Sequence, residues 1–241
     1  MIRIVFTVLA MAASLVMFAQ ADTTAQRPAT TVALPRANDH FMLQVGYTTW
    51  TGQPDSISTS GLPRTFNMYF LFDFPFRTNP RFSTAIGAGV ATDNVYFEKT
   101  RVELNGNSTN LRFRNLSDTS SFKKYKLTTA YLEAPIELRY RSNPSNDRKS
   151  FKAAIGAKVG LLVNAHTKGK NLQGSTGNNI GDYTEKISSR RYFNTNRISL
   201  TGRVGYGNVS LFGSFAATPL FKEGVAAPIR PLTVGLTLSG L

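Results

Sequence analysis

The sequence predicts an all-β fold, an up-and-down antiparallel barrel of eight strands over residues 40–241, and three observations support this prediction. Eight segments alternate apolar and polar residues with the period of two that is typical of strands. No window shows the 3.6-residue period of an amphipathic helix. The connections alternate between long and short, as in a meander whose tight turns all lie at one end.

The clearest strand pattern is YLEAPIELRYRS at residues 131–142. Leu132 and Ile136 lie on its apolar face, and Glu133 and Arg139 lie on the opposite, charged face. Seven other segments alternate in a similar way. The eight strands are expected at 41–50, 66–76, 82–91, about 125–142, 151–163, 198–206, 209–217 and 232–241.

The lengths of the connections favour a membrane barrel over a soluble one. Outer-membrane barrels have short periplasmic turns and long extracellular loops. The expected short connections are 75–81, 142–149 and 206–208, and the expected long ones are 52–64, 98–122, 165–190 and 218–230. Within them, 101–115 contains an Asn-Gly turn signal, so it forms either a hairpin above the membrane or two further strands, which would make ten. The glycine-rich segment 169–182 is expected to be an extracellular loop.

The N-terminus has the features of a secretory signal peptide. Arg3 precedes an apolar run that extends to Ala19, and Ala19-Gln20-Ala21 matches a small-residue cleavage pattern. We therefore expect a signal peptide at 1–21 and a disordered lead-in at 22–39; the alternative is a membrane anchor helix, for which the apolar run is short. The absence of cysteine excludes disulfides and a lipoprotein anchor.

A membrane barrel directs its apolar rows to lipid and its charged rows to the interior. Eight strands enclose a space that side chains can fill, so opposite charges inside would pair and close the lumen. The alternative is a soluble exported barrel or sandwich, whose apolar rows would form the core. The expected lumen charge network comprises Asp73, Glu133, Glu137, Arg139, Lys152, Lys158 and Arg203.

The formal net charge of +14 indicates an anionic partner. Nucleic acid is not expected, because the chain has an export signal and no nucleic-acid-binding motif. The expected partners are outer-membrane lipid and lipopolysaccharide, whose phosphates bind Arg and Lys, or an acidic protein of the envelope. The expected anion-binding rim comprises Lys123, Lys124, Lys126, Lys186, Arg190 and Arg191.

The sequence offers no convincing catalytic site. Its two histidines, His40 and His166, fall at opposite ends of the predicted barrel, so they cannot share a site. No His, Cys or carboxylate cluster has the spacing of metal ligands. We therefore expect no enzyme, no metal and no cofactor; the alternative enzyme is an outer-membrane barrel that modifies lipid A, which needs a nucleophile and a base within hydrogen-bond reach.

The segment YLEAPIELRYRS resembles the Tyr-Leu-Glu-x-Pro-x-x-Leu-(Lys/Arg)-Tyr segment of the PorT-like outer-membrane β-barrel family of Bacteroidota. The next strand, FKAAIGAKVGLLV, resembles the strand that follows in that family, where a Gly-x-x-x-Gly pattern precedes a loop. The resemblance covers most of residues 40–241. It implies an integral outer-membrane barrel without shared catalytic residues, and some members of the family serve protein secretion. The chain departs from the usual barrel ending, an aromatic residue, in its last residues LTLSGL.

Overall fold

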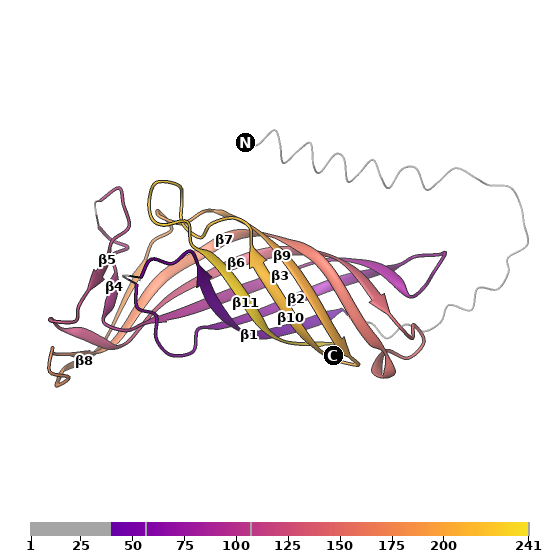
Figure 1. The fold of residues 1–241 in the computed structure, drawn as a ribbon, viewed down its shortest axis with the longest axis horizontal. Coiled ribbons are helices and arrows are strands. Elements are labelled where there is room, and N and C mark those ends of the chain that lie inside the picture. Colours follow the sequence, from indigo (N-terminus) through magenta and orange to yellow (C-terminus); the bar gives the residue numbers. More distant parts are fainter. Residues whose placement is uncertain (1–39, 56, 107, 241) are drawn as a thin grey trace, which may run out of the picture. The chain divides into compact units, whose positions relative to one another are not determined.

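The computed structural model describes residues 40–55, 57–106 and 108–240, and these form a closed antiparallel barrel (Figure 1). The signal peptide and lead-in expected at 1–39 lie outside the described residues. The strands that make the barrel wall are β1 (Phe41–Thr51), β2 (Arg64–Pro75), β3 (Phe82–Phe97), β6 (Ser121–Arg141), β7 (Phe151–Gln173), β9 (Asn196–Tyr206), β10 (Val209–Ala216) and β11 (Arg230–Ser239).

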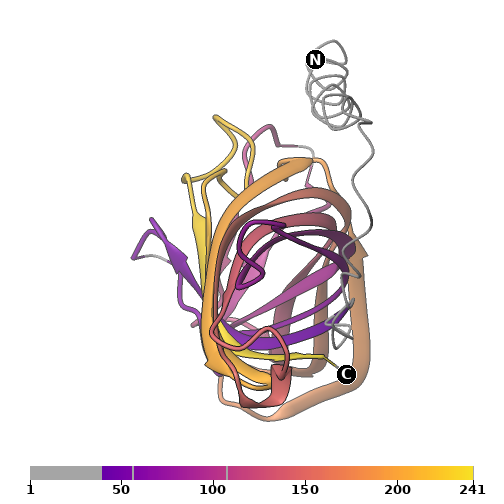
Figure 2. The same ribbon diagram turned by 90° about the vertical axis from the view of Figure 1, so that its right-hand side faces the viewer.

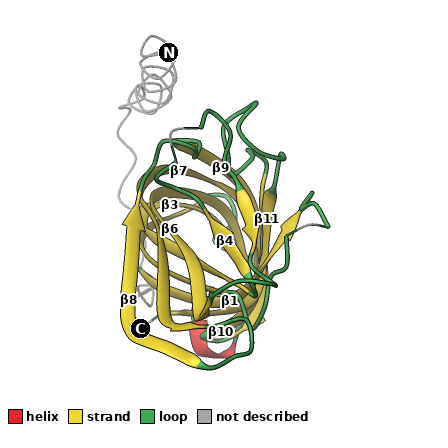
Figure 3. Ribbon diagram, turned by 90° about the vertical axis from the view of Figure 1, so that its left-hand side faces the viewer, coloured by secondary structure: helices red, strands yellow, loops and turns green. Residues whose placement is uncertain are grey.

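The wall follows the order β6-β3-β2-β1-β11-β10-β9-β7, and pairing of β6 with β7 closes it. Figure 2 shows the closed ring from the end with the short turns, and Figure 3 shows it from the end with the long loops. One strand, β8 (Asn179–Ser188), lies outside the ring and pairs with the part of β7 beyond the bulge described below. A single 3-10 turn, η1 (Asp147–Lys149), lies in a short connection. No helix among the described residues is long and apolar enough to cross a membrane.

The structure confirms the eight-stranded barrel and the alternation of loop lengths. The segment 101–115 contributes β4 (Thr100–Val102) and β5 (Phe113–Asn115), which pair only with each other, so the ten-stranded alternative is wrong. The expected end of the fifth strand at 163 is also wrong, because β7 continues to Gln173 and turns back into β8. The glycine-rich segment 169–182 is therefore mostly the tip of a hairpin.

A β-bulge at Val163 explains why β7 was expected to end there. Tyr131 pairs with Leu162 and Ala130 with Asn164, so Val163 is the extra residue. An extra residue inverts which positions face outward. Before the bulge the odd-numbered residues of β7 face outward, and after it the even-numbered ones do. The period-two alternation of outward and inward residues is therefore interrupted at Val163, although the strand itself continues.

The barrel is apolar outside and charged inside. Leu132, Ile136 and Leu138, the apolar row of the opening strand pattern, are about half exposed, whereas Glu133 and Glu137 between them are buried. Rows of exposed aliphatic and phenylalanine side chains continue around the other strands. A soluble barrel would hide these rows, because large exposed apolar patches are unfavourable in water. This distribution is therefore that of a barrel whose outer surface is in lipid.

Glycines make room for large side chains in the narrow lumen. Tyr69, which is almost fully buried, lies across the backbone of β3 at Gly89. A Cβ atom at Gly89 would lie 2.1 Å from the carbonyl oxygen of Met68 and 2.5 Å from Cδ1 of Tyr69, both closer than van der Waals contact permits. A side chain there would push Tyr69 away from Glu133. The hydroxyl of Tyr69 donates a hydrogen bond to the carboxylate of Glu133.

Candidate functional site: a plugged lumen and a lysine belt

Charged side chains fill the middle of the lumen in an upper cluster around Glu133. The Glu133 carboxylate accepts hydrogen bonds from Nε and Nη2 of Arg197, at 3.1 and 2.6 Å, and lies 3.7 Å from Nζ of Lys158. Arg197 also donates to Asp93 and stacks on the ring of Tyr131 at 3.7 Å. Every charge of this cluster therefore has an opposite charge nearby, which is the condition for burying ions in a barrel.

A lower cluster surrounds Glu137 nearer the short turns. Its Oε2 atom accepts hydrogen bonds from Nε of Arg139 at 2.9 Å and from Nη2 of Arg203 at 3.1 Å. Asp73 lies 3.7 Å from Arg139 and 3.2 Å from Arg141. All seven residues of the expected network lie inside the barrel, and Lys152 is buried on β7 opposite Arg141. Sequence reasoning missed three members of the two clusters: Asp93, Arg141 and Arg197.

Loops close the lumen at the opposite end with apolar side chains. Trp50 contacts the rings of Phe97 and Phe221, with centroids 5.6 and 6.2 Å apart, and Phe193 packs on Phe221 at 5.2 Å. All four are buried in one cluster with residues of β4 and the long loops. We call this cluster the aromatic cap. Together with the charged clusters it fills much of the described part of the lumen, where the cavity beside Lys158 and Arg197 measures about 20 Å³.

Cations gather on the outer surface where β6, β7 and β8 extend beyond the apolar rows. Lys126 of β6 lies opposite Lys168 of β7, and Lys168 lies opposite Lys186 of β8. Lys124 lies opposite Lys170 in the same way. Neighbouring strands are about 4.8 Å apart, so these ammonium groups crowd together on one face. We call the five residues the lysine belt.

The lysine belt is not balanced by acidic side chains in the part of the chain that the structure describes. Among the described residues no ion pair joins a belt lysine to a carboxylate, and the polar contact of Lys126 is the amide oxygen of Asn94 at 2.7 Å. Burial and the charges of Lys168 and Lys170 lower the pKa of Lys126. Mutual repulsion of this kind is costly for the protein alone and is relieved by a bound anion.

The structure brings together four of the six residues expected at the anion-binding rim. Lys124, Lys126 and Lys186 belong to the belt, and Lys123 precedes it on β6. Arg190 lies away from the belt, beside the part of β7 before the bulge, with Nη1 3.5 Å from the carbonyl oxygen of Leu162. Arg191 lies instead against the ring of Tyr192. The predicted rim did not include Lys168 and Lys170, because the segment 165–190 was expected to be a loop. Both lysines lie on β7 beyond the bulge at Val163.

The two histidines lie far apart along the barrel. His40 precedes β1 at the short-turn end, with Nδ1 2.7 Å from the carbonyl oxygen of Leu71. His166 lies on β7 beyond the bulge, beside the lysine belt, where burial and the charges of Lys186, Lys126 and Lys168 lower its pKa. No group of metal-binding side chains occurs within the described ranges.

A family model described as "Outer membrane protein beta-barrel domain" matches residues 18–222. The chain belongs to this family. Family membership and the exposed apolar rows of the exterior place this barrel protein in the outer membrane, with its strands crossing the bilayer.

Solved structures similar to this barrel protein include Ail, the attachment invasion locus protein of Yersinia pestis, in complex with the heparin analogue sucrose octasulfate. That pair has 14% identity over 83% of this chain and 96% of Ail, with a TM-score of 0.35. Another structure of Ail has 12% identity over 84% and 97% of the chains, with a TM-score of 0.34. A mutant Rh. blastica porin has 9% identity over 83% and 98%, with a TM-score of 0.15. No curated protein matches the sequence significantly.

Proposed function

We propose that this protein is a non-conducting, non-enzymatic barrel that holds its extracellular end at the cell surface by binding lipopolysaccharide phosphates through the lysine belt. The observation that carries the proposal is the row of Lys126, Lys168 and Lys186 on three paired strands, without acids between them. Phosphate oxygens accept charge-assisted hydrogen bonds from ammonium groups, and one phosphate can reach cations on adjacent strands.

The height of the belt supports this ligand. On the outer face, the pair of Tyr96 and Lys126 comes three steps after the last apolar pair, Val90 and Leu132. Three steps of two residues on a strand tilted by about 40° raise the belt by roughly 15 Å. The belt therefore lies beyond the hydrocarbon, at the level of phosphorylated sugars in an outer leaflet.

The filled lumen supports a role through the surface and not through transport. The charged clusters and the aromatic cap occupy the space that a pore would need. Among the described residues the side-chain hydrogen bonds of the two histidines go to the Leu71 carbonyl and to Asn164, not to a hydroxyl group. The resemblance to PorT-like barrels of Bacteroidota supports an accessory role in the envelope, and protein secretion is the process that this resemblance suggests.

Co-purification tests the proposal. The full chain is extracted in mild detergent, and bound lipopolysaccharide is measured per mole of protein for the wild type and for a variant with Lys124, Lys168, Lys170 and Lys186 all changed to Glu. We expect bound lipopolysaccharide to fall at least about tenfold, since each surface contact contributes roughly 0.5–1 kcal/mol.

The matched control changes the exposed cations of the short-turn end, which would face the periplasm. Arg77, Arg81, Arg148 and Lys149 are all changed to Glu, so that the same charge is reversed away from the belt. This control should keep its lipopolysaccharide, and both variants should keep the heat-dependent gel shift of a folded barrel. Unchanged lipopolysaccharide on the belt variant would contradict the proposal, and loss of an acidic protein instead would identify that partner as the ligand.

A further inference from the structure

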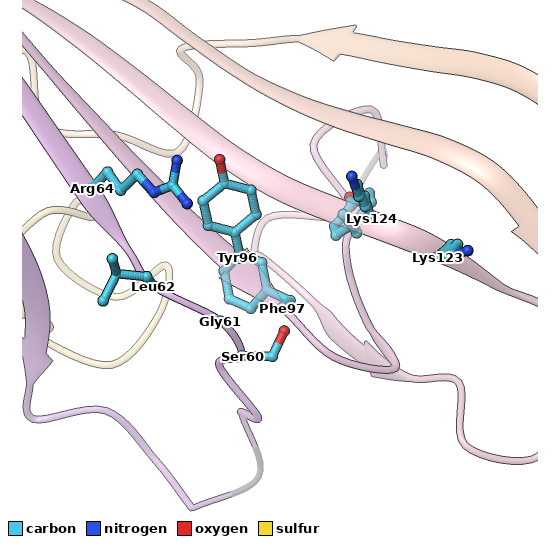
Figure 4. A pocket seen from close by; sticks show the side chains of 9 residues that line it. Ser60, Gly61, Leu62, Arg64, Tyr96, Phe97, Lys123 and Lys124 are labelled. Atoms are coloured by element: carbon cyan, nitrogen blue, oxygen red, sulfur yellow. The ribbon is translucent and has the colours of Figure 1, made fainter.

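A pocket of about 370 Å³ opens on the outer face next to the lysine belt (Figure 4). Leu62 and Arg64 line it from the first long loop and β2, Tyr96 lines it from β3, and Lys123 and Lys124 line it from β6. Figure 4 shows Arg64 and Leu62 on one side of the Tyr96 ring and the two lysines on the other.

The chain fixes the wall of this pocket before any ligand arrives. The amide of Ser60 donates to the carbonyl oxygen of Tyr96 at 2.9 Å, and Thr59 forms a bridge with Phe97. The loop then turns at Gly61, whose φ of +68° favours glycine. These bonds hold the loop against the edge of β3, so Leu62 stays exposed beside the pocket.

Tyr96 also lines a second pocket, of about 230 Å³, with four members of the lysine belt: Lys124, Lys126, Lys168 and Lys170. Lys126 places its ammonium 5.9 Å from the centre of the Tyr96 ring. The half-buried tyrosine therefore stands between Arg64 on one side and a group of lysines, Lys123 and the belt, on the other. Glu98, the exposed acid two residues after Tyr96, lines neither pocket.

An aromatic ring between two cationic pockets has a specific chemical complement. The apolar face of a pyranose ring packs against an aromatic side chain, while guanidinium and ammonium groups bind phosphates bidentately or as point charges. A single inorganic phosphate would use one pocket and leave the ring bare. A sugar with a phosphate at each end would use both.

We propose that Tyr96 is the stacking platform for a phosphorylated amino-sugar disaccharide, with one phosphate held by Arg64 and the other by the lysine belt together with Lys123. Leu62 contacts the apolar edge of the sugar. This inference rests on the proposed function and adds that the protein recognises the sugar between the phosphates as well as the charge. Lys124, which lines both pockets, lies with Lys123 on the belt side of the ring.

The experiment measures affinity of the full chain in detergent for three soluble probes: deacylated lipid A, which is a bisphosphorylated glucosamine disaccharide, the same disaccharide without phosphate, and inorganic pyrophosphate. The variants are Tyr96→Ala, Tyr96→Phe and Arg64→Gln. We expect Tyr96→Ala and Arg64→Gln each to weaken binding of the bisphosphorylated sugar about tenfold, the effect of one strong polar or packing contact. Tyr96→Phe keeps the ring and should bind as the wild type does.

The probes separate this inference from the proposed function. If Tyr96→Ala binds the bisphosphorylated sugar as well as the wild type, or loses pyrophosphate to the same extent, the stacking role is wrong. Loss of binding only in the belt variant would then leave the proposed function standing. If neither the belt variant nor Tyr96→Ala loses the sugar, both fail. Each variant must show the gel shift of the folded barrel, and Tyr96→Phe serves as the folded reference for the ring.

Discussion

Replacing Glu133 by alanine should destabilise the barrel more than any exposed substitution. The carboxylate is about 1% exposed and is bonded to Arg197, to the hydroxyl of Tyr69 at 2.5 Å and to Lys158. Removing it leaves Arg197 its bond to Asp93, but among the described residues it leaves Lys158 without a carboxylate within ion-pair distance. Breaking a buried ion pair in this way costs about 3–5 kcal/mol, because one charge remains buried without compensation.

The measurement is reversible unfolding of the detergent- or lipid-embedded protein in denaturant. Trp50 is the chain's single tryptophan and is buried in the aromatic cap, so its fluorescence reports the folded state. The control is Glu98→Ala, an exposed acid that directly follows β3, which should change the free energy of unfolding by less than about 0.5 kcal/mol.

A double variant distinguishes lost charge balance from lost packing. Glu133→Gln with Lys158→Met removes one charge of each sign and keeps side chains of similar size, so it should cost less than about half of the Glu133→Ala loss. If Glu133→Ala matched Glu98→Ala, the carboxylate would have to be solvated, and the plugged lumen would be wrong. If the double variant were as unstable as Glu133→Ala, packing and not charge would explain the loss.

Other perturbations test the narrow lumen, the closed pore and the belt. Gly89→Ala should lower the free energy of unfolding by about 1–3 kcal/mol by displacing Tyr69. Gly213→Ala should be tolerated, because its added methyl group meets nothing within 4 Å. If both variants lost the gel shift of the folded barrel at the same heating temperature, this reasoning would be contradicted. Planar-bilayer recordings should show no porin-sized current, and a large steady conductance would refute the plug. The pKa of His166, measured by NMR, should lie below about 6.5 without lipid. The stability that the barrel has above that pH should therefore decline as the pH falls. Added lipopolysaccharide should raise the pKa of His166, and an unchanged pKa would count against phosphate binding at the belt.

The membrane-crossing part of the barrel could be predicted from the sequence because lipid and lumen impose opposite demands on successive residues. Leu132 and Glu133 illustrate this, one facing lipid and the next buried among cations. The prediction failed where the strands leave the lipid. Thr92 and Asn94 are polar on the outer face, so the expected strand stopped at residue 91, two residues before Asp93. Arg197 fell one residue outside the strand expected at 198–206.

The belt was only partly predictable for a different reason. Its central residues, Lys168 and Lys170, lie beyond the bulge at Val163, which inverts the alternation within one continuous strand. A period-two pattern read from residue 151 would direct both lysines into the lumen. Pairing with β8 also cannot be read from local sequence, and it is this pairing that places Lys186 beside Lys168.

The charges of the lumen and those of the rim differ in whether the described chain supplies their counter-charges. Inside the barrel, Arg197 and Arg203 have carboxylates within hydrogen-bond distance, so these two charges are paired by the chain itself. On the rim, Lys126 and Lys168 face other cations, and no acid of the described residues forms an ion pair with them. Lysines on adjacent strands repel one another, and an anion between them relieves that repulsion, which is the reason for proposing a phosphate ligand there. The paired charges of the lumen therefore contribute to the stability of the barrel, whereas the charges of the rim are the ones for which we propose a ligand.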